Sequence, residues 1–388
     1  MEQEIGVIKI YTKTIKYGKI FIMHYIVNKT CYITFIDKLV LYGGIIMIYT
    51  LQGLRALAML GIFLFHSGLL LNGTFPVTFF FILSGFVLYY TKSNTVDNMD
   101  FKQNIRWVFL KMRPFYIIHV ITFLFSIIIR WEWINNMETS ILFKRIIIDL
   151  LLIQSFFKEN VFIFNGLAWF LSVIFILYLV AIPIIKLIKR IKLNKLIIFM
   201  CLILITQYIL NLINIINRGD LYLYSNPLYR LLDFCLGMIV AKMFLENKFE
   251  IKDYNRYEIG IVITFILMYL ISFFIDTGCS YYSALFIIAL YIFSYQKGCI
   301  SKLLKCRVLQ NLAKISFEFY MIHELMLILF RSVFSNLNYN WIIKNIIICI
   351  PSLIISLIIS KLISKYITQN IKCNYRSEII ERQRYEVN

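Results

Sequence analysis

The chain has 388 residues, of which 60% are hydrophobic, and its mean hydropathy is +0.77. A soluble domain of this size does not need so much apolar surface, and repeated apolar runs of about 20 residues indicate a polytopic α-helical membrane protein. The net charge of +19 comes from Lys and Arg that cluster between those runs, as they do in cytoplasmic loops. We therefore expect the partner of this chain to be a lipid bilayer and not a nucleic acid.

Residues 1–50 form the first segment, in which Lys residues alternate with short apolar runs. Asp37 and Lys38 interrupt the one stretch that could otherwise have spanned a bilayer. We interpret this segment either as a cytoplasmic extension or as a translation-start artefact upstream of Met47. The opening residues lack the basic region and cleavage site of a signal peptide.

An all-α membrane domain is predicted for residues 51–367, followed by a cytoplasmic tail at 368–388. Ten apolar stretches are long enough to span a bilayer as helices. They are 53–71, 75–91, 112–130, 167–188, 195–215, 228–245, 258–275, 280–296, 315–335 and 341–366. A further apolar run, 146–158, has about 13 residues and is too short to cross. We predict that it forms an interfacial or re-entrant helix on the outer side.

The positive charges decide the orientation. Lys and Arg gather at 92–106, 186–195, 242–256, 297–307 and 372–384, whereas the intervening loops carry almost none. The positive-inside rule places these clusters, and both termini, in the cytoplasm. Ten crossings satisfy this arrangement, because an even number returns the chain to the side on which it began. The amino-acid usage is typical of an AT-rich bacterial genome and favours a bacterial plasma membrane.

The first predicted helix carries two polar residues on one stripe. Arg55 and His66 are eleven positions apart, which brings them within roughly 20° of the same face and about 16 Å apart along the axis. Ionisable groups inside a bilayer are costly and usually functional. A cation near one surface and an imidazole deeper in the membrane can hold a charged substrate and carry out chemistry on it.

Six patches of the sequence, taken in order, resemble the acyltransferase-3 family of membrane proteins. The patches are Arg55 with His66, Phe80-Phe81-Ile82-Leu83-Ser84-Gly85-Phe86, Lys111-Met112-Arg113-Pro114, Trp169-Phe170-Leu171-Ser172, Arg230-Leu231-Leu232-Asp233-Phe234 and Ser316-Phe317-Glu318-Phe319-Tyr320-Met321-Ile322-His323. The resemblance covers residues 52 to about 366. It implies an enzyme that takes an acyl group from acyl-CoA on the cytoplasmic side and passes it to a hydroxyl, often on a cell-surface polysaccharide.

The resemblance assigns roles to several residues. His66 is the predicted catalytic residue, either as general base or as a transient acyl carrier. Arg55, Lys111 and Arg113 are predicted to bind the phosphates of CoA, although each could instead be a positive-inside anchor. Predicted supporting or substrate-binding residues are Ser84, Trp169, Arg230, Asp233, Ser316, His323 and Glu324.

Some of these residues have competing structural interpretations. Ser84 and Gly85 suit close helix packing. Arg230 and Asp233 are one turn apart and could form either a structural ion pair or an acceptor-binding site. We expect no metal site, because the eight Cys are scattered without a Cys-x-x-Cys pair.

Two acids common in relatives are absent from this chain, which has Val173-Ile174-Phe175 and Thr78 at those places. Asp149, Asp233 or Glu324 could substitute for them. These departures leave the acceptor open between a surface polysaccharide and a small molecule. A polysaccharide or lipid-linked sugar exporter, or a sensor without catalysis, would also suit ten helices with buried charges.

Overall fold

The computed structural model describes residues 10–14, 19–23, 47–70, 72–97, 99–217, 221–246, 249, 251–274, 278, 280–335 and 340–368. The chain divides into two units, 1–47 and 48–388. In the first, strands β1 (Ile10–Thr14) and β2 (Lys19–Met23) pair antiparallel. Tyr49 and Thr50, the last residues of the expected extension, instead begin helix α2 of the second unit. Residues 1–9, 15–18 and 24–46 of the extension, and all but the first residue of the predicted tail, lie outside the described residues, so both assignments stay predictions.

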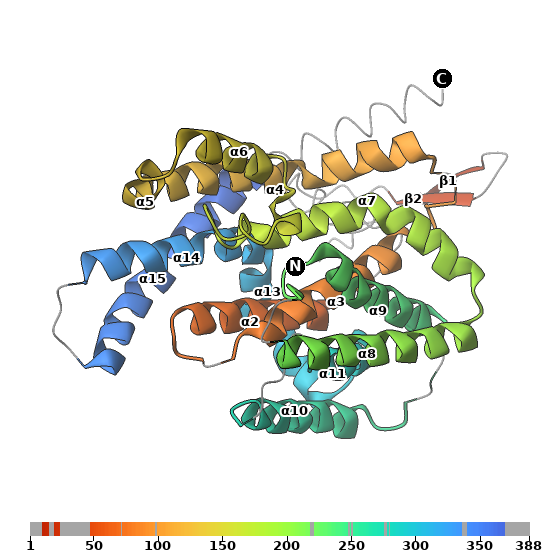
Figure 1. The fold of residues 1–388 in the computed structure, drawn as a ribbon. Helices are drawn as coiled ribbons and strands as arrows, with labels where there is room; N and C mark the ends of the chain where they lie inside the picture. The colour runs from red at the N-terminus through yellow and green to blue at the C-terminus, as the bar shows by residue number, and fades with distance from the viewer. Residues whose placement is uncertain are drawn as a thin grey trace, which may run out of the picture. The chain divides into compact units, whose positions relative to one another are not determined.

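Within its described residues the second unit consists of helices joined by turns and loops, which confirms the predicted helical class for the membrane domain (Figure 1). Its α-helices are α2 (Tyr49–His66), α3 (Thr74–Lys92), α4 (Phe101–Ile129), α5 (Trp131–Asn135), α6 (Thr139–Leu150), α7 (Ala168–Arg190), α8 (Leu193–Ile216), α9 (Pro227–Leu245), α10 (Tyr254–Ile271), α11 (Ser283–Ser294), α12 (Cys299–Leu304), α13 (Arg307–Lys314), α14 (Ser316–Val333) and α15 (Trp341–Ile363). Two short helices, η1 (Gln154–Phe156) and η2 (Ser364–Thr368), complete the described part.

Each of the ten predicted spanning stretches coincides with a helix, but the helices differ in length. Among the described residues, six are long and apolar enough to cross a membrane: α3, α4, α7, α8, α10 and α15. The other four are α2, α9, α11 and α14. Of these, α11 has 12 residues, or about 18 Å, which is less than the hydrocarbon core of about 30 Å. Ten crossings are therefore not established by helix length.

The predicted non-spanning stretch 146–158 is split between two helices. It begins within α6, which has 12 residues, and continues through η1 after a turn. The turn between them contains Leu152 in a left-handed conformation, with φ of 57°. Ser155 of η1 is then held against α7 by a hydrogen bond of 2.7 Å between its hydroxyl and that of Ser172. The short α6 thus folds back onto longer helices.

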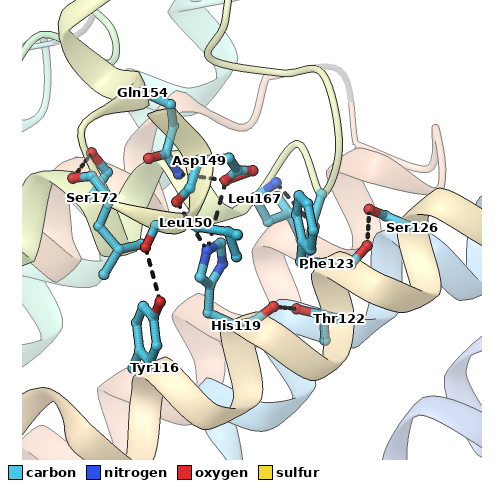
Figure 2. Close-up of polar contacts among 12 residues, drawn as sticks. Tyr116, His119, Thr122, Phe123, Ser126, Asp149, Leu150, Gln154, Leu167 and Ser172 are labelled. Atoms are coloured by element: carbon cyan, nitrogen blue, oxygen red, sulfur yellow. Dashed lines mark hydrogen bonds and ion pairs between the residues drawn. The ribbon is translucent and has the colours of Figure 1, made fainter. Parts of the chain in front are cut away.

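A buried polar cluster fixes α6 against α4 (Figure 2). His119 of α4 points at the end of α6, where its Nε2 lies 3.1 Å from the carbonyl oxygen of Asp149 and 3.7 Å from its carboxylate. Gln154 donates to the same carboxylate at 3.1 Å, and Tyr116 donates to the carbonyl of Leu150 at 3.0 Å. The hydrogen bonds offset part of the cost of burying these groups, since the His119 Nδ1 and Gln154 Oε1 atoms are buried without a partner among the described residues.

Two glycines allow α3 and α9 to pack backbone to backbone (Figure 1). A Cβ at Gly85 would lie 1.9 Å from the carbonyl oxygen of Phe234, and a Cβ at Gly237 would lie 1.8 Å from that of Ile82. Close approach through small residues is the usual way in which membrane helices associate. The packing interpretation of Gly85 therefore fits the structure, and this contact holds the α3 wall of the site described next.

Candidate functional site

Two neighbouring cavities lie along α2, one beside each of its two predicted site residues. The Arg55 cavity, of about 210 Å³, is walled by α2, α3, α4, α7 and α14, and its polar lining includes Arg55, Lys111 and Tyr178. The His66 cavity, of about 310 Å³, is lined by His66 and Glu324 together with aromatic rings. The helical stripe predicted from the sequence therefore faces a pair of cavities.

The Arg55 cavity brings cations together above apolar walls. Arg55 is half-buried and interacts electrostatically with Glu318 and Tyr178. The Lys111 ammonium lies 5.7 Å from the ring centre of Tyr178 and 5.7 Å from that of Trp107. Lys92, at the end of α3, lies 5.3 Å from the same Trp107 ring. Arg55 and Lys111 thus bring two cations from two helices to one cavity, where an anion can bind, and Lys92 of a third helix shares the Trp107 ring with Lys111 without lining the cavity.

The His66 cavity combines an imidazole, a carboxylate and aromatic rings. His66 ends α2, and Glu324 of α14 lines the same cavity and interacts with it electrostatically. The Glu324 Oε2 atom is buried and has no hydrogen-bond partner among the described residues. Trp169 and Tyr224 supply two of the aromatic walls. A carboxylate beside an imidazole can orient the ring and stabilise its protonated form during proton transfer.

His323 packs behind His66 rather than lining either cavity. Its ring centre lies 5.4 Å from that of His66, and it stacks on Phe319 at 5.5 Å. Its Nδ1 lies 3.1 Å from the carbonyl oxygen of Phe319, which can only accept, so Nδ1 carries the proton. Its Nε2 then bears a lone pair and is buried without a hydrogen-bond partner in the described part of the chain. His323 thus presents an acceptor nitrogen in the packing behind the site.

The family model described as an acyltransferase domain matches residues 48–361 of this chain. The chain belongs to the acyltransferase-3 family. It is therefore an acyltransferase, and its apolar helices make it a membrane protein. No curated protein and no solved structure matches the chain.

In this acyltransferase, Arg230 and Asp233 form a fully buried ion pair and line neither cavity. The guanidinium donates to the Asp233 carboxylate at 2.8 Å and to the Thr78 hydroxyl at 3.2 Å. It also donates to the carbonyl of Tyr224 at 2.7 Å, and Tyr224 lines the His66 cavity. This geometry favours the interpretation of Arg230 and Asp233 as a structural ion pair. It also places Asp233 near Thr78, a position at which an acid was expected from the family resemblance.

The remaining predicted residues of the acyltransferase are divided between the two cavities. Ser84 and Ser316 line the Arg55 cavity, where Ser84 also donates to the Phe80 carbonyl of its own helix at 2.7 Å. Trp169 lines the His66 cavity. Arg113 is exposed and is not among the lining residues of either cavity, so the structure gives it no place in the anion site.

Three residues at or beside this site were not predicted from the sequence, and of them Tyr320 lines the cavities whereas Lys92 and Trp107 lie next to Lys111. Lys92 belongs to a cluster of positive charges that the positive-inside rule already explains, so the sequence gives no separate indication that it binds a ligand. Trp107 carries no motif signal, although its position one turn before Lys111 places both on one face of α4. Tyr320 is part of a recognised motif, but its place between the two cavities depends on how α14 packs against α2 and α3.

Proposed function

We propose that this membrane acyltransferase moves an acyl group, most simply acetyl, from acyl-CoA to a hydroxyl of a cell-surface or exopolysaccharide sugar. The observation that carries the proposal is the pair of adjoining cavities along α2, with cations at one and a histidine–carboxylate pair at the other. One cavity suits an anionic donor with an apolar arm, and the other suits an acceptor that must lose a proton.

The donor is proposed to enter at the Arg55 cavity. Arg55 and Lys111 would bind phosphates of CoA, since a guanidinium and an ammonium are the side chains best suited to phosphate oxygens. The walls beyond them are apolar, including Leu83, Phe115 and Ile174, and fit the uncharged pantetheine arm. The distance of about 16 Å along α2 from Arg55 to His66 suits an extended arm whose thioester points at His66.

The transfer is proposed to occur at the His66 cavity. Neutral His66 would take the proton from the acceptor hydroxyl while the oxygen forms a bond to the thioester carbonyl carbon. The carbon–sulfur bond then breaks, and the departing CoA thiolate takes the proton from the imidazolium. Glu324 would orient His66 and stabilise its charged form. Trp169 and Tyr224 would offer flat apolar faces and polar edges to a sugar ring.

The proposed location is the bacterial plasma membrane, with ten crossings and both termini in the cytoplasm. The basic clusters at helix ends support this orientation, because the positive-inside rule places them on the cytoplasmic side. Lys92 and Lys111, which meet at Trp107 beside the Arg55 cavity, would then face the compartment that contains acyl-CoA. The acceptor would approach from the opposite side.

The test is the ester acetyl content of purified surface polysaccharide, released by mild base. Strains to compare are the wild type, a deletion, and the deletion complemented with the wild-type gene, His66→Ala or His66→Gln, at matched protein levels. Loss of ester acetyl in the deletion, restored by the wild-type gene and by neither variant, is the expected result. Unchanged acetyl in the deletion would contradict the proposal and direct attention to a small-molecule acceptor or to export. Full rescue by either His66 variant would refute the role of His66.

A further inference from the structure

Three residues line both cavities and therefore separate them: Ile62 of α2, Val77 of α3 and Tyr320 of α14. We call this set the waist. All three side chains are buried, with exposed fractions of 2%, 4% and 7%. The boundary between the cavities is thus formed by one residue from each of three helices.

Restricted rotamers, a hydrogen bond and ring packing limit the movement of the waist side chains. Ile62 and Val77 are β-branched, and such side chains have a strongly preferred rotamer in a helix. The Tyr320 hydroxyl donates to the carbonyl of Leu167 at 3.2 Å, and its ring packs against Phe170 at 5.5 Å between ring centres. A passing group must therefore fit the opening rather than reshape it freely.

We propose that the waist selects the length of the acyl group, admitting acetyl and disfavouring longer chains. This inference rests on the proposed function, in which the donor lies in the Arg55 cavity and reacts at His66. The acyl end leads the donor, so the whole acyl chain must pass Ile62, Val77 and Tyr320 before the thioester carbonyl reaches His66. The chain must then share about 310 Å³ with the acceptor.

The expected size of the effect follows from the chemistry of apolar contacts. One extra methylene in a tight hydrophobic site typically changes discrimination by about 10- to 200-fold. Butyryl-CoA, with two more methylenes than acetyl-CoA, should be at least tenfold poorer as a donor. Shortening Ile62 or Val77 to Ala should remove much of that difference by widening the opening.

The experiment measures the release of CoA thiol by the purified full-length protein in detergent, with de-esterified polysaccharide from the deletion strain as acceptor. Donors are acetyl-, butyryl- and hexanoyl-CoA. Ile62→Ala and Val77→Ala are compared with Met59→Ala, which also shortens a buried side chain of α2 but lies in a separate apolar cluster with Phe319. Tyr320→Phe removes only the hydrogen bond to Leu167.

The waist is supported if the wild type prefers acetyl-CoA and Ile62→Ala or Val77→Ala raises the butyryl-to-acetyl rate ratio at least tenfold. Met59→Ala should keep the wild-type ratio, and Tyr320→Phe should raise it less than the alanine variants. The waist is overturned if the wild type uses all three donors equally, or if folded Ile62→Ala and Val77→Ala both keep its ratio. Thiol release from none of the donors by the wild type would instead overturn the proposed function, and the waist with it.

Discussion

Replacing Gly237 by Ala should disrupt the contact between α9 and α3. The added Cβ would lie 1.8 Å from the Ile82 carbonyl oxygen, whereas real Cβ contacts are essentially never under 3.0 Å. The two atoms must therefore separate by at least 1.2 Å, and the obstacle is backbone rather than a flexible side chain. Overpacking of this kind costs about 1–3 kcal/mol, and a clash with backbone belongs at or above the upper end. Because Gly85 makes the reciprocal contact, the shift loosens the interface on both sides.

The chain supplies a matched control for this change. Gly260, in α10, has nothing within 4 Å of the position of an added Cβ. Gly260→Ala should therefore leave stability unchanged, or raise it by up to about 1 kcal/mol through helix propensity. The assay is thermal unfolding in detergent, followed by the fluorescence of tryptophans that include the buried Trp169. Equal melting temperatures for Gly237→Ala, Gly260→Ala and the wild type would refute the backbone-contact argument.

Three other perturbations test the buried charges and the cation cluster. Burial raises the pKa of the Asp149 carboxyl from 3.8 to about 7. Because the unfolded chain loses this proton at a lower pH than the folded chain, the buried carboxyl lowers the free energy of unfolding increasingly between pH 3.8 and about 7, and by a constant amount at higher pH. Asp149→Asn should therefore raise the melting temperature at pH 8, with a gain that shrinks towards pH 4; a gain that grew on acidification would contradict this. Asp233→Asn removes the carboxylate beside the buried Arg230 guanidinium and should cost about 3–5 kcal/mol in denaturation assays, whereas replacing both by apolar residues should cost much less. Lys92→Ala and Lys111→Ala should each weaken the binding of CoA in calorimetry but not that of pantetheine, which lacks the phosphates; equal weakening of both ligands would argue for a packing role.

The arrangement of Arg55 and His66 could be predicted from the sequence because it depends on one helix alone. A spacing of eleven residues fixes their relation whatever surrounds them. The pairing of Arg230 with Asp233 was likewise one of two local possibilities, since residues three apart on a helix are neighbours. Helix positions were predictable for the same reason, although α4 begins eleven residues earlier than its apolar stretch because its first turns are polar.

Contacts between helices could not be predicted from the sequence. Glu318 and Glu324 lie on one helix, and only packing against α2 shows that the first interacts with Arg55 and the second with His66. Arg113 follows a basic motif closely, yet its side chain is exposed while that of Lys111 lines the cavity. The walls of both cavities come from segments scattered along the chain, so their existence could not be derived from any local pattern.

The attachment of α2 has a consequence for biosynthesis. The Tyr49 backbone N–H donates to the Gln296 side chain, the Thr50 hydroxyl donates to the Phe293 carbonyl, and the Gln310 side chain donates to the Tyr49 carbonyl. These partners are 243 to 261 positions further along the chain. The helix that carries Arg55 and His66 therefore leaves the ribosome early but acquires the anchors of its first turn only after α11 and α13 have been translated. A nascent chain that stops before α11 contains both site residues but lacks all three of the partners that anchor the first turn of their helix.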